Sequence, residues 1–108
     1  MNIEDLRSYA LSLPYAEETF PFGENVIVFK AKGKMFLLLP LNSEKLNFNV
    51  KCDPEHAIEL REQYSSIQPG YHMNKKHWNT IFVDGSLNSK QLKEFIEDSY
   101  KLVSKKTK

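Results

Sequence analysis

The chain has 108 residues, of which 41% are hydrophobic and 27% are charged. These values are typical of one globular domain with a single core, and they exclude a two-domain protein and a largely disordered one. Fifteen basic against fourteen acidic residues give a net charge of +1, so a site for an anionic partner must come from local charge, because a general basic excess is absent.

The amino terminus and the single cysteine indicate a cellular compartment. Cys52 cannot form an internal disulfide, which fits a reducing cytoplasm. We expect no signal peptide, because the first residues carry neither a basic leader nor an apolar run. The longest apolar block, residues 35–39, is far short of the ~20 residues that cross a bilayer. The prediction is a cytoplasmic protein without a membrane partner.

The first predicted element is a helix capped by Asn2 and ended by Pro14. Its apolar residues at helical spacing are Ile3, Leu6, Ala10 and Leu13. Phe20 and Phe22, on either side of a proline, follow in a bend or a short edge segment. We expect both rings to pack in the core, since large aromatic side chains are usually buried; the alternative is contact with a ligand.

Residues 26–31 and 34–39 are predicted to form a β-hairpin that turns at Lys32-Gly33. Three lysines gather at its tip: Lys30, Lys32 and Lys34. The favoured interpretation is a solvated edge that resists aggregation. The alternative is a basic wing that touches phosphate.

Residues 45–51 show the clearest strand pattern in the chain. Leu46, Phe48 and Val50 are expected on the core face, opposite Lys45, Asn47, Asn49 and Lys51. Amide and ammonium groups can donate to phosphates or base edges. A solvated sheet surface is the other interpretation.

Asp53-Pro54 is predicted to begin a second helix, which ends near Ser65. A strand is expected over residues 78–83, and Asn88 with Gln91 resembles a capping box for the last helix. The apolar stripe of that helix is Leu92, Phe95, Ile96, Ser99, Leu102 and Val103.

This order of elements predicts a two-layer α+β domain, with a mainly antiparallel sheet and three helices. We expect one domain over residues 1–104 and a short basic tail over residues 105–108.

Residues 69–80, Pro-Gly-Tyr-His-Met-Asn-Lys-Lys-His-Trp-Asn-Thr, are dense in large polar side chains and begin with a turn dipeptide. This segment, Phe-Pro-Phe-Gly at 20–23, Lys-Cys-Asp-Pro at 51–54 and the overall length resemble the MmcQ/YjbR-like family of small bacterial proteins. The resemblance covers essentially the whole chain. It implies a fold similar to the small secretion chaperones, hairpins described as a double wing, and DNA binding.

Enzyme and metal sites are not indicated by the sequence. Cys52 and His56 lie four residues apart at a helix start, but no third group that would orient them is identifiable. His72 and His77, with these two residues, do not match a known zinc spacing. We expect no catalytic residue, no cofactor and no metal.

Nucleic acid is the better candidate ligand for the segment 69–80. Lys75 and Lys76 can neutralise phosphates, Tyr71 and Trp78 can stack, and two asparagines, Asn74 and Asn79, can reach base edges. Packing in the core is the favoured alternative for Trp78. The complete predicted set is Lys30, Lys32, Lys34, Lys45, Lys51, Tyr71, His72, Asn74, Lys75, Lys76, His77 and Trp78.

The predicted function is therefore weak, salt-sensitive DNA binding. An alternative is a protein-interaction or chaperone-like module that holds a partner segment. A third is a pocket for a small anionic ligand, lined by His72, Lys75, Lys76 and His77.

Overall fold

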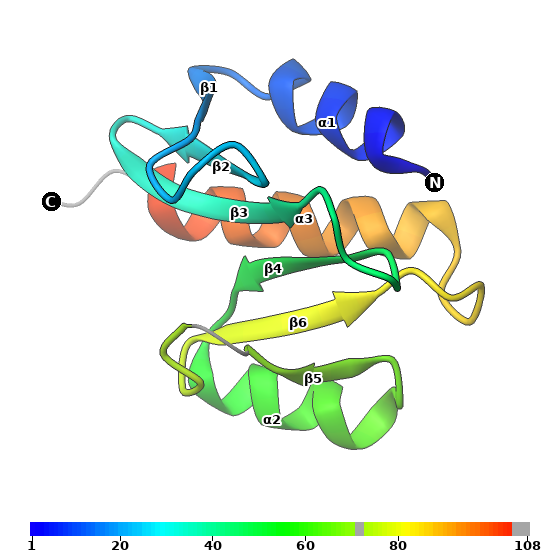
Figure 1. Ribbon diagram of the computed structural model, residues 1–108. Helices are drawn as coiled ribbons and strands as arrows, with labels where there is room; N and C mark the ends of the chain where they lie inside the picture. The colour runs from blue at the N-terminus through cyan, green and yellow to red at the C-terminus, as the bar shows by residue number, and fades with distance from the viewer. Residues whose placement is uncertain (71–72, 105–108) are drawn as a thin grey trace, which may run out of the picture.

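The computed structural model describes residues 1–70 and 73–104. Its elements are α1 (Ile3–Ser12), β1 (Ala16–Thr19), β2 (Val26–Ala31), β3 (Lys34–Pro40), β4 (Asn47–Lys51), α2 (Pro54–Gln63), β5 (Ile67–Pro69), β6 (Trp78–Phe82) and α3 (Ser89–Ser104). The strands form one antiparallel sheet in the order β1-β2-β3-β4-β6-β5 (Figure 1). The predicted α+β fold with three helices is confirmed. Tyr71, His72 and the basic tail 105–108 lie outside the described residues.

All three helices begin at the caps that the sequence predicts. Asn2 and Asp5 form a reciprocal capping box on α1, and Asp53 accepts a hydrogen bond from the His56 amide on α2. Asn88 and Gln91 exchange two such bonds at the start of α3. The three helices share one core with the sheet, to which they contribute Leu6, Ala10, Ala57, Leu60, Leu92, Ile96 and Val103.

A β-bulge in β3 interrupts the regular alternation of the sheet. Phe29 pairs with Leu37 and Lys30 pairs with Met35, so Phe36 is an extra residue without a partner on β2. Phe36 and Leu37 consequently both pack in the core beneath the helices. Ser99 of α3 completes the local hydrogen bonding, because its hydroxyl donates to the Phe36 carbonyl at 2.6 Å and accepts from the Lys51 amide at 2.8 Å.

The sequence did not predict β1 and β5, and it misplaced two aromatic rings. Both strands are short edges, of four and three residues, too short for a period to be recognised. Pro69 belongs to β5 and pairs with Asn79, where a turn was expected. The expectation that Phe20 and Phe22 are core residues is wrong, since they are 49% and 61% exposed.

The face of the sheet away from the helices, called the open face below, has its own small apolar cluster. Val28, Leu38 and Trp78 are buried there, and Val26, Met35 and Met73 pack against them. Figure 1 shows the connection between β1 and β2 curling in front of β2 and β3. Among the described helices, none has the length and apolar character that a bilayer span requires.

Candidate nucleic-acid interface

The β2–β3 hairpin tip and the loop before β6 lie at the same end of the sheet (Figure 1). The strand register shows why. Leu37 of β3 pairs with Val50, and the next residue, Lys51, pairs with Trp78 at the start of β6. Two strand spacings, about 10 Å, separate β3 from β6. The lysines of the hairpin tip and those of residues 73–77 therefore lie at the same end of the sheet.

The hairpin tip is a tight turn with positive φ at both central residues, 54° for Lys32 and 83° for Gly33. This geometry matches the twist of the flanking strands. The Lys32 ammonium lies 5.2 Å from the centroid of the Tyr15 ring, a cation–π contact that leaves the charge at the surface. The turn thus defines the backbone at the tip, and the contact with Tyr15 positions the Lys32 ammonium.

The loop before β6 is organised by Asn74. Its side-chain oxygen accepts from the Lys76 amide at 2.9 Å, and its carbonyl accepts from the amides of His77 and Trp78 at 3.1 and 3.0 Å. The Cys52 amide donates to the His77 carbonyl at 2.7 Å. Asn74 therefore has a structural role in the turn, and its predicted contact with nucleic acid stays a prediction.

Arg61 of α2 anchors this loop from the helix side. Its Nε donates to Asn79 Oδ1 at 2.7 Å, and its Nη2 donates to the carbonyls of Lys75 and Trp78. Asn79, which is 1% exposed, also donates to the Ala57 carbonyl at 3.4 Å. Sequence reasoning missed Arg61, because the helical pattern showed only that it shares a side with apolar residues.

The lysines at this end form no ion pair with a carboxylate in the part of the chain that the structure describes. Within residues 1–70 and 73–104, the ion pairs are Arg7–Glu18 and His56–Glu59. Glu17 stands opposite Lys30 in the sheet register without forming one. We call five residues the lysine end: Lys30, Lys32, Lys34, Lys75 and Lys76. Apart from half-buried Lys30, they are exposed.

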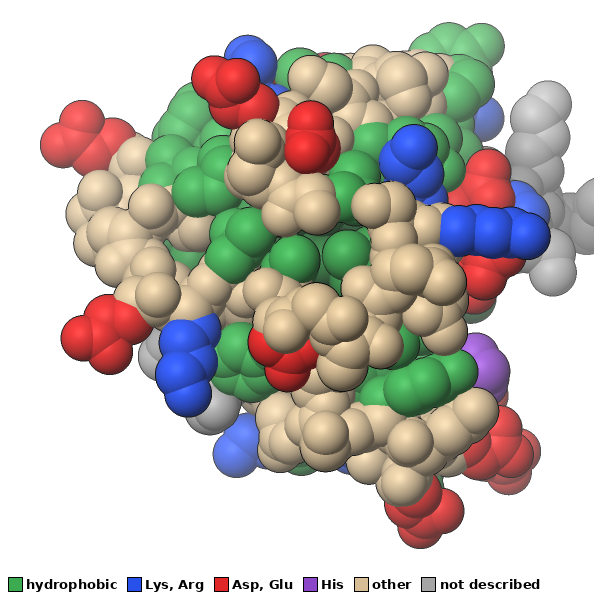
Figure 2. All heavy atoms as spheres, turned by 90° about the vertical axis from the view of Figure 1, so that its right-hand side faces the viewer, with side chains coloured by type: hydrophobic (Ala, Val, Ile, Leu, Met, Phe, Trp, Pro, Cys, Tyr) green, Lys and Arg blue, Asp and Glu red, His purple; other side chains and the backbone are tan. Residues whose placement is uncertain are grey.

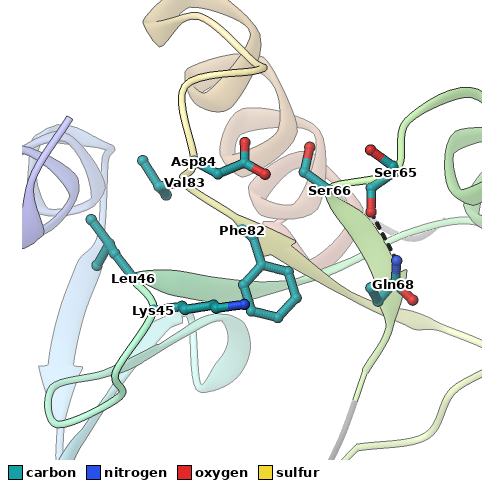
Figure 3. A pocket seen from close by; sticks show the side chains of 8 residues that line it. All are labelled: Lys45, Leu46, Ser65, Ser66, Gln68, Phe82, Val83 and Asp84. Atoms are coloured by element: carbon teal, nitrogen blue, oxygen red, sulfur yellow. Dashed lines mark hydrogen bonds between the residues drawn. The ribbon is translucent and has the colours of Figure 1, made fainter.

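Two predicted lysines fall outside this group. Lys51 lies at the same end but shares a shallow hollow with Asp53 and Asp98. Lys45 precedes β4, at the opposite end of the sheet, so the structure does not bring it together with the other lysines, and its predicted contact with nucleic acid stays a prediction. There it lines a hollow of about 560 Å³ with Asp84, Phe82 and five other residues (Figure 3). Figure 2 shows that end, where hydrophobic side chains lie in a hollow and both acidic and basic side chains lie around it.

The aromatic and amide parts of the predicted site are less accessible than its lysines. Trp78 is 6% exposed and packs with Val28 and Leu38, as the core interpretation expects, so its ring cannot stack on a base in this structure. Asn79 faces α2 and is not available to base edges. His77 is half-buried, and the predictions for Tyr71 and His72 lie outside the described residues.

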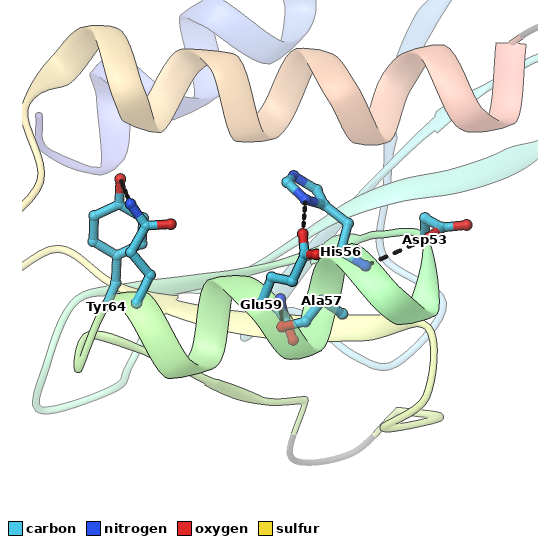
Figure 4. Close-up of polar contacts among 7 residues, drawn as sticks. Asp53, His56, Ala57, Glu59 and Tyr64 are labelled. Atoms are coloured by element: carbon cyan, nitrogen blue, oxygen red, sulfur yellow. Dashed lines mark hydrogen bonds and ion pairs between the residues drawn. The ribbon is translucent and has the colours of Figure 1, made fainter.

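Cys52 is a buried thiol next to the cap of α2. Burial, with the nearby charges of Asp53 and Asp98, raises its pKa from 9.0 to about 11. The neighbouring His56 points to Glu59, with 3.5 Å between Nδ1 and Oε1 (Figure 4). At neutral pH the sulfur is therefore protonated and is a weak nucleophile. Among the described residues, no three His, Cys, Asp or Glu side chains are placed to share a metal ion.

We predict that Cys52 reacts about 100-fold more slowly with a thiol reagent at pH 8 in the folded protein than in the unfolded chain. A pKa raised by about two units reduces the thiolate fraction by that factor. The rate of labelling by iodoacetamide, with and without denaturant, measures this difference. Equal rates would show that the thiol is accessible and ionised.

Comparison with known proteins identifies relatives over nearly the whole chain. The chain is 39% identical over 100 residues to YbdF of Escherichia coli O157:H7, covering 93% of this chain and 82% of that protein. It is 31% identical over 100 residues to YjbR of Escherichia coli strain K12, covering 93% and 85%. Both relatives are described as uncharacterized proteins.

A crystal structure of Deinococcus radiodurans protein DR2400, from the domain family DUF419, superimposes with a TM-score of 0.90 at 43% identity. The match covers 97% of this chain and 80% of that chain. A Pseudomonas syringae protein gives a TM-score of 0.82 at 29% identity, covering 95% and 99%. The sequence model of the YjbR family matches residues 11–102. This chain belongs to the YjbR family.

Proposed function

We propose that this protein binds nucleic acid through the lysine end, mainly by contacts to phosphate. The observation that carries the proposal is the gathering of five lysines, from a hairpin tip and a loop, without a carboxylate partner among the described residues. Ammonium groups on a rigid tip and an anchored loop can meet successive phosphates of a nucleic-acid backbone. In this account the β2–β3 hairpin acts as a wing.

The low net charge limits the strength of this binding. At +1 overall, the protein has no long-range field to concentrate DNA around it, so affinity must come from the few lysines in contact. The phosphate contacts carry no sequence information. We therefore propose weak binding with little sequence preference. We also propose that the protein acts in the cytoplasm, because a single free cysteine fits a reducing compartment in which disulfides are rare.

The proposal predicts that substituting Lys75 and Lys76 by alanine weakens binding of a labelled DNA by about tenfold or more at low salt, because two phosphate contacts are lost. The matched control is the double variant Lys45→Ala/Lys90→Ala. It removes the same charge at the other end of the molecule, since Lys90 is the second residue of α3 (Figure 1). Fluorescence anisotropy measures both affinities. An equal loss in both variants would contradict a localised interface.

The alternative, a protein-interaction module, is supported less well by the edges of the sheet. Adding a partner strand requires a long unpaired edge, whereas β1 and β5 have four and three residues and β5 contains Pro69. Partner capture that is insensitive to salt and unchanged by Lys75→Ala/Lys76→Ala would favour this alternative.

A further inference from the structure

The open face contains a small, mostly apolar cavity that the lysine contacts do not explain. Its volume is about 250 Å³, and it is lined by Phe22, Val26, Leu38, Pro40, Asn49 and Met73. These residues come from the β1–β2 connection, three strands and the loop before β6. Two loops thus form the walls, and the sheet forms the floor.

We propose that the nucleic acid bound by this protein is single-stranded, and that one base enters this cavity between Phe22 and Met73. The inference rests on the proposed function and specifies its ligand. A base offers flat apolar faces and a polar edge, and the cavity offers the complementary arrangement. Five of its lining residues are apolar, and the sixth is an amide.

Phe22 provides the wall on which a base can stack. Phe22 is 61% exposed although it borders an apolar cavity, so its ring is accessible to a ligand. Met73, from the loop before β6, lines the same cavity and packs on the open-face cluster. Aromatic rings bind bases of any sequence in this way, because every base has a π-face.

Asn49 provides the polar contact at the floor. Its Oδ1 accepts a hydrogen bond from the Thr80 hydroxyl at 2.5 Å, which fixes the orientation of the amide. Its amide nitrogen has no hydrogen-bond partner in the described part of the chain. This nitrogen can donate to an acceptor on the edge of a base.

The cavity and the lysine end lie on one path along β2. Val26 lines the cavity and Val28 belongs to the open-face cluster. Lys30 lies two residues beyond Val28, so all three side chains are on the same face of β2. Four residues of strand span about 13 Å, the length of about four stacked nucleotides. One strand of nucleic acid can therefore place a base in the cavity and its phosphates beside Lys30 and the hairpin tip.

A duplex does not fit this arrangement. Its bases are paired and stacked, and one of them reaches a protein cavity only if it is flipped out, at a cost in free energy. A single strand presents its bases without that cost. The cavity therefore favours the single strand, whereas the lysines alone attract both forms.

The test compares single-stranded oligodeoxythymidine of about 12 nucleotides, within the site sizes of single-strand-binding domains, with a duplex of equal length. Anisotropy titrations at low salt use wild type, Phe22→Ala and Phe22→Tyr. Phe20→Ala is the matched control, because Phe20 is 49% exposed and does not line the cavity. Unchanged thermal midpoints verify that the variants are folded.

We expect wild type to bind the single strand more tightly, and Phe22→Ala to weaken that binding roughly tenfold, within the range for loss of one stacked base. Phe22→Tyr, Phe20→Ala and all duplex affinities should change less than about twofold. A duplex bound as tightly as the single strand, or single-strand binding insensitive to Phe22→Ala, would overturn this inference and leave the proposed function standing. Failure of both oligonucleotides to bind would overturn both.

Discussion

Replacing Arg61 by methionine is expected to lower the free energy of unfolding by about 2–4 kcal/mol, because three hydrogen bonds from a charged donor are lost, one of them to the side chain of buried Asn79. Asn79 is 1% exposed, and its Oδ1 would lose its 2.7 Å bond to the guanidinium. The carbonyls of Lys75 and Trp78 would lose the same donor. Methionine keeps most of the apolar stem, so the polar contacts account for the difference. Chemical denaturation measures it.

The same substitution is predicted to weaken nucleic-acid binding although Lys75 and Lys76 remain, because the loop that carries them loses its anchor on α2. The matched control is Arg7→Met. The Arg7 guanidinium forms two short bonds to Glu18, at 2.7 and 2.6 Å, but 46% of its side chain is exposed, and exposed ion pairs contribute little to stability. If both variants lost the same stability, the anchoring role of Arg61 would be wrong.

Replacing Ser99 by alanine is expected to cost about 2–3 kcal/mol, since the buried Phe36 carbonyl and the half-buried Lys51 amide lose their partner. The serine hydroxyl accepts from the Lys51 amide and donates to the Phe36 carbonyl. At this point the bulge at Phe36 prevents β3 and β4 from bonding to each other directly. The hydroxyl thus links β3, β4 and α3 near the hairpin tip.

Denaturant unfolding of Ser99→Ala beside Ser8→Ala tests this role. Ser8 is exposed on α1, so its substitution should change stability by less than about 0.5 kcal/mol. A Ser99→Ala protein as stable as Ser8→Ala would mean that water or a backbone shift satisfies both groups.

The parts of the fold that depend on local chemistry could be predicted from the sequence. Asn2, Asp53 and Asn88 have short polar side chains that cap helices, and each does so here. The Lys32-Gly33 turn and the alternation from Phe48 to Val50 also depend only on neighbouring residues. Strands β1 and β5 could not be found, because they exist only through pairing with β2 and β6.

The candidate site was predictable in composition but not in arrangement. The sequence indicated the lysines, yet only the register of β3, β4 and β6 places Lys34 and Lys75 at the same end of the sheet and Lys45 at the other. Arg61 donates hydrogen bonds to carbonyls fourteen and seventeen residues further along the chain. The spacing of residues within a helix cannot predict such contacts with another segment. Phe22 was expected inside because it is large and apolar, whereas the sheet leaves it at the rim of a cavity.

The salt dependence of nucleic-acid binding tests the lysine end most directly. The logarithm of the duplex association constant is expected to fall linearly with the logarithm of salt concentration, with a slope of about −0.9 per phosphate contacted. Lys75→Ala/Lys76→Ala should reduce the magnitude of the slope by about two, whereas Lys45→Ala/Lys90→Ala should leave it unchanged. A slope near zero for wild type, or the same slope in both double variants, would contradict the account.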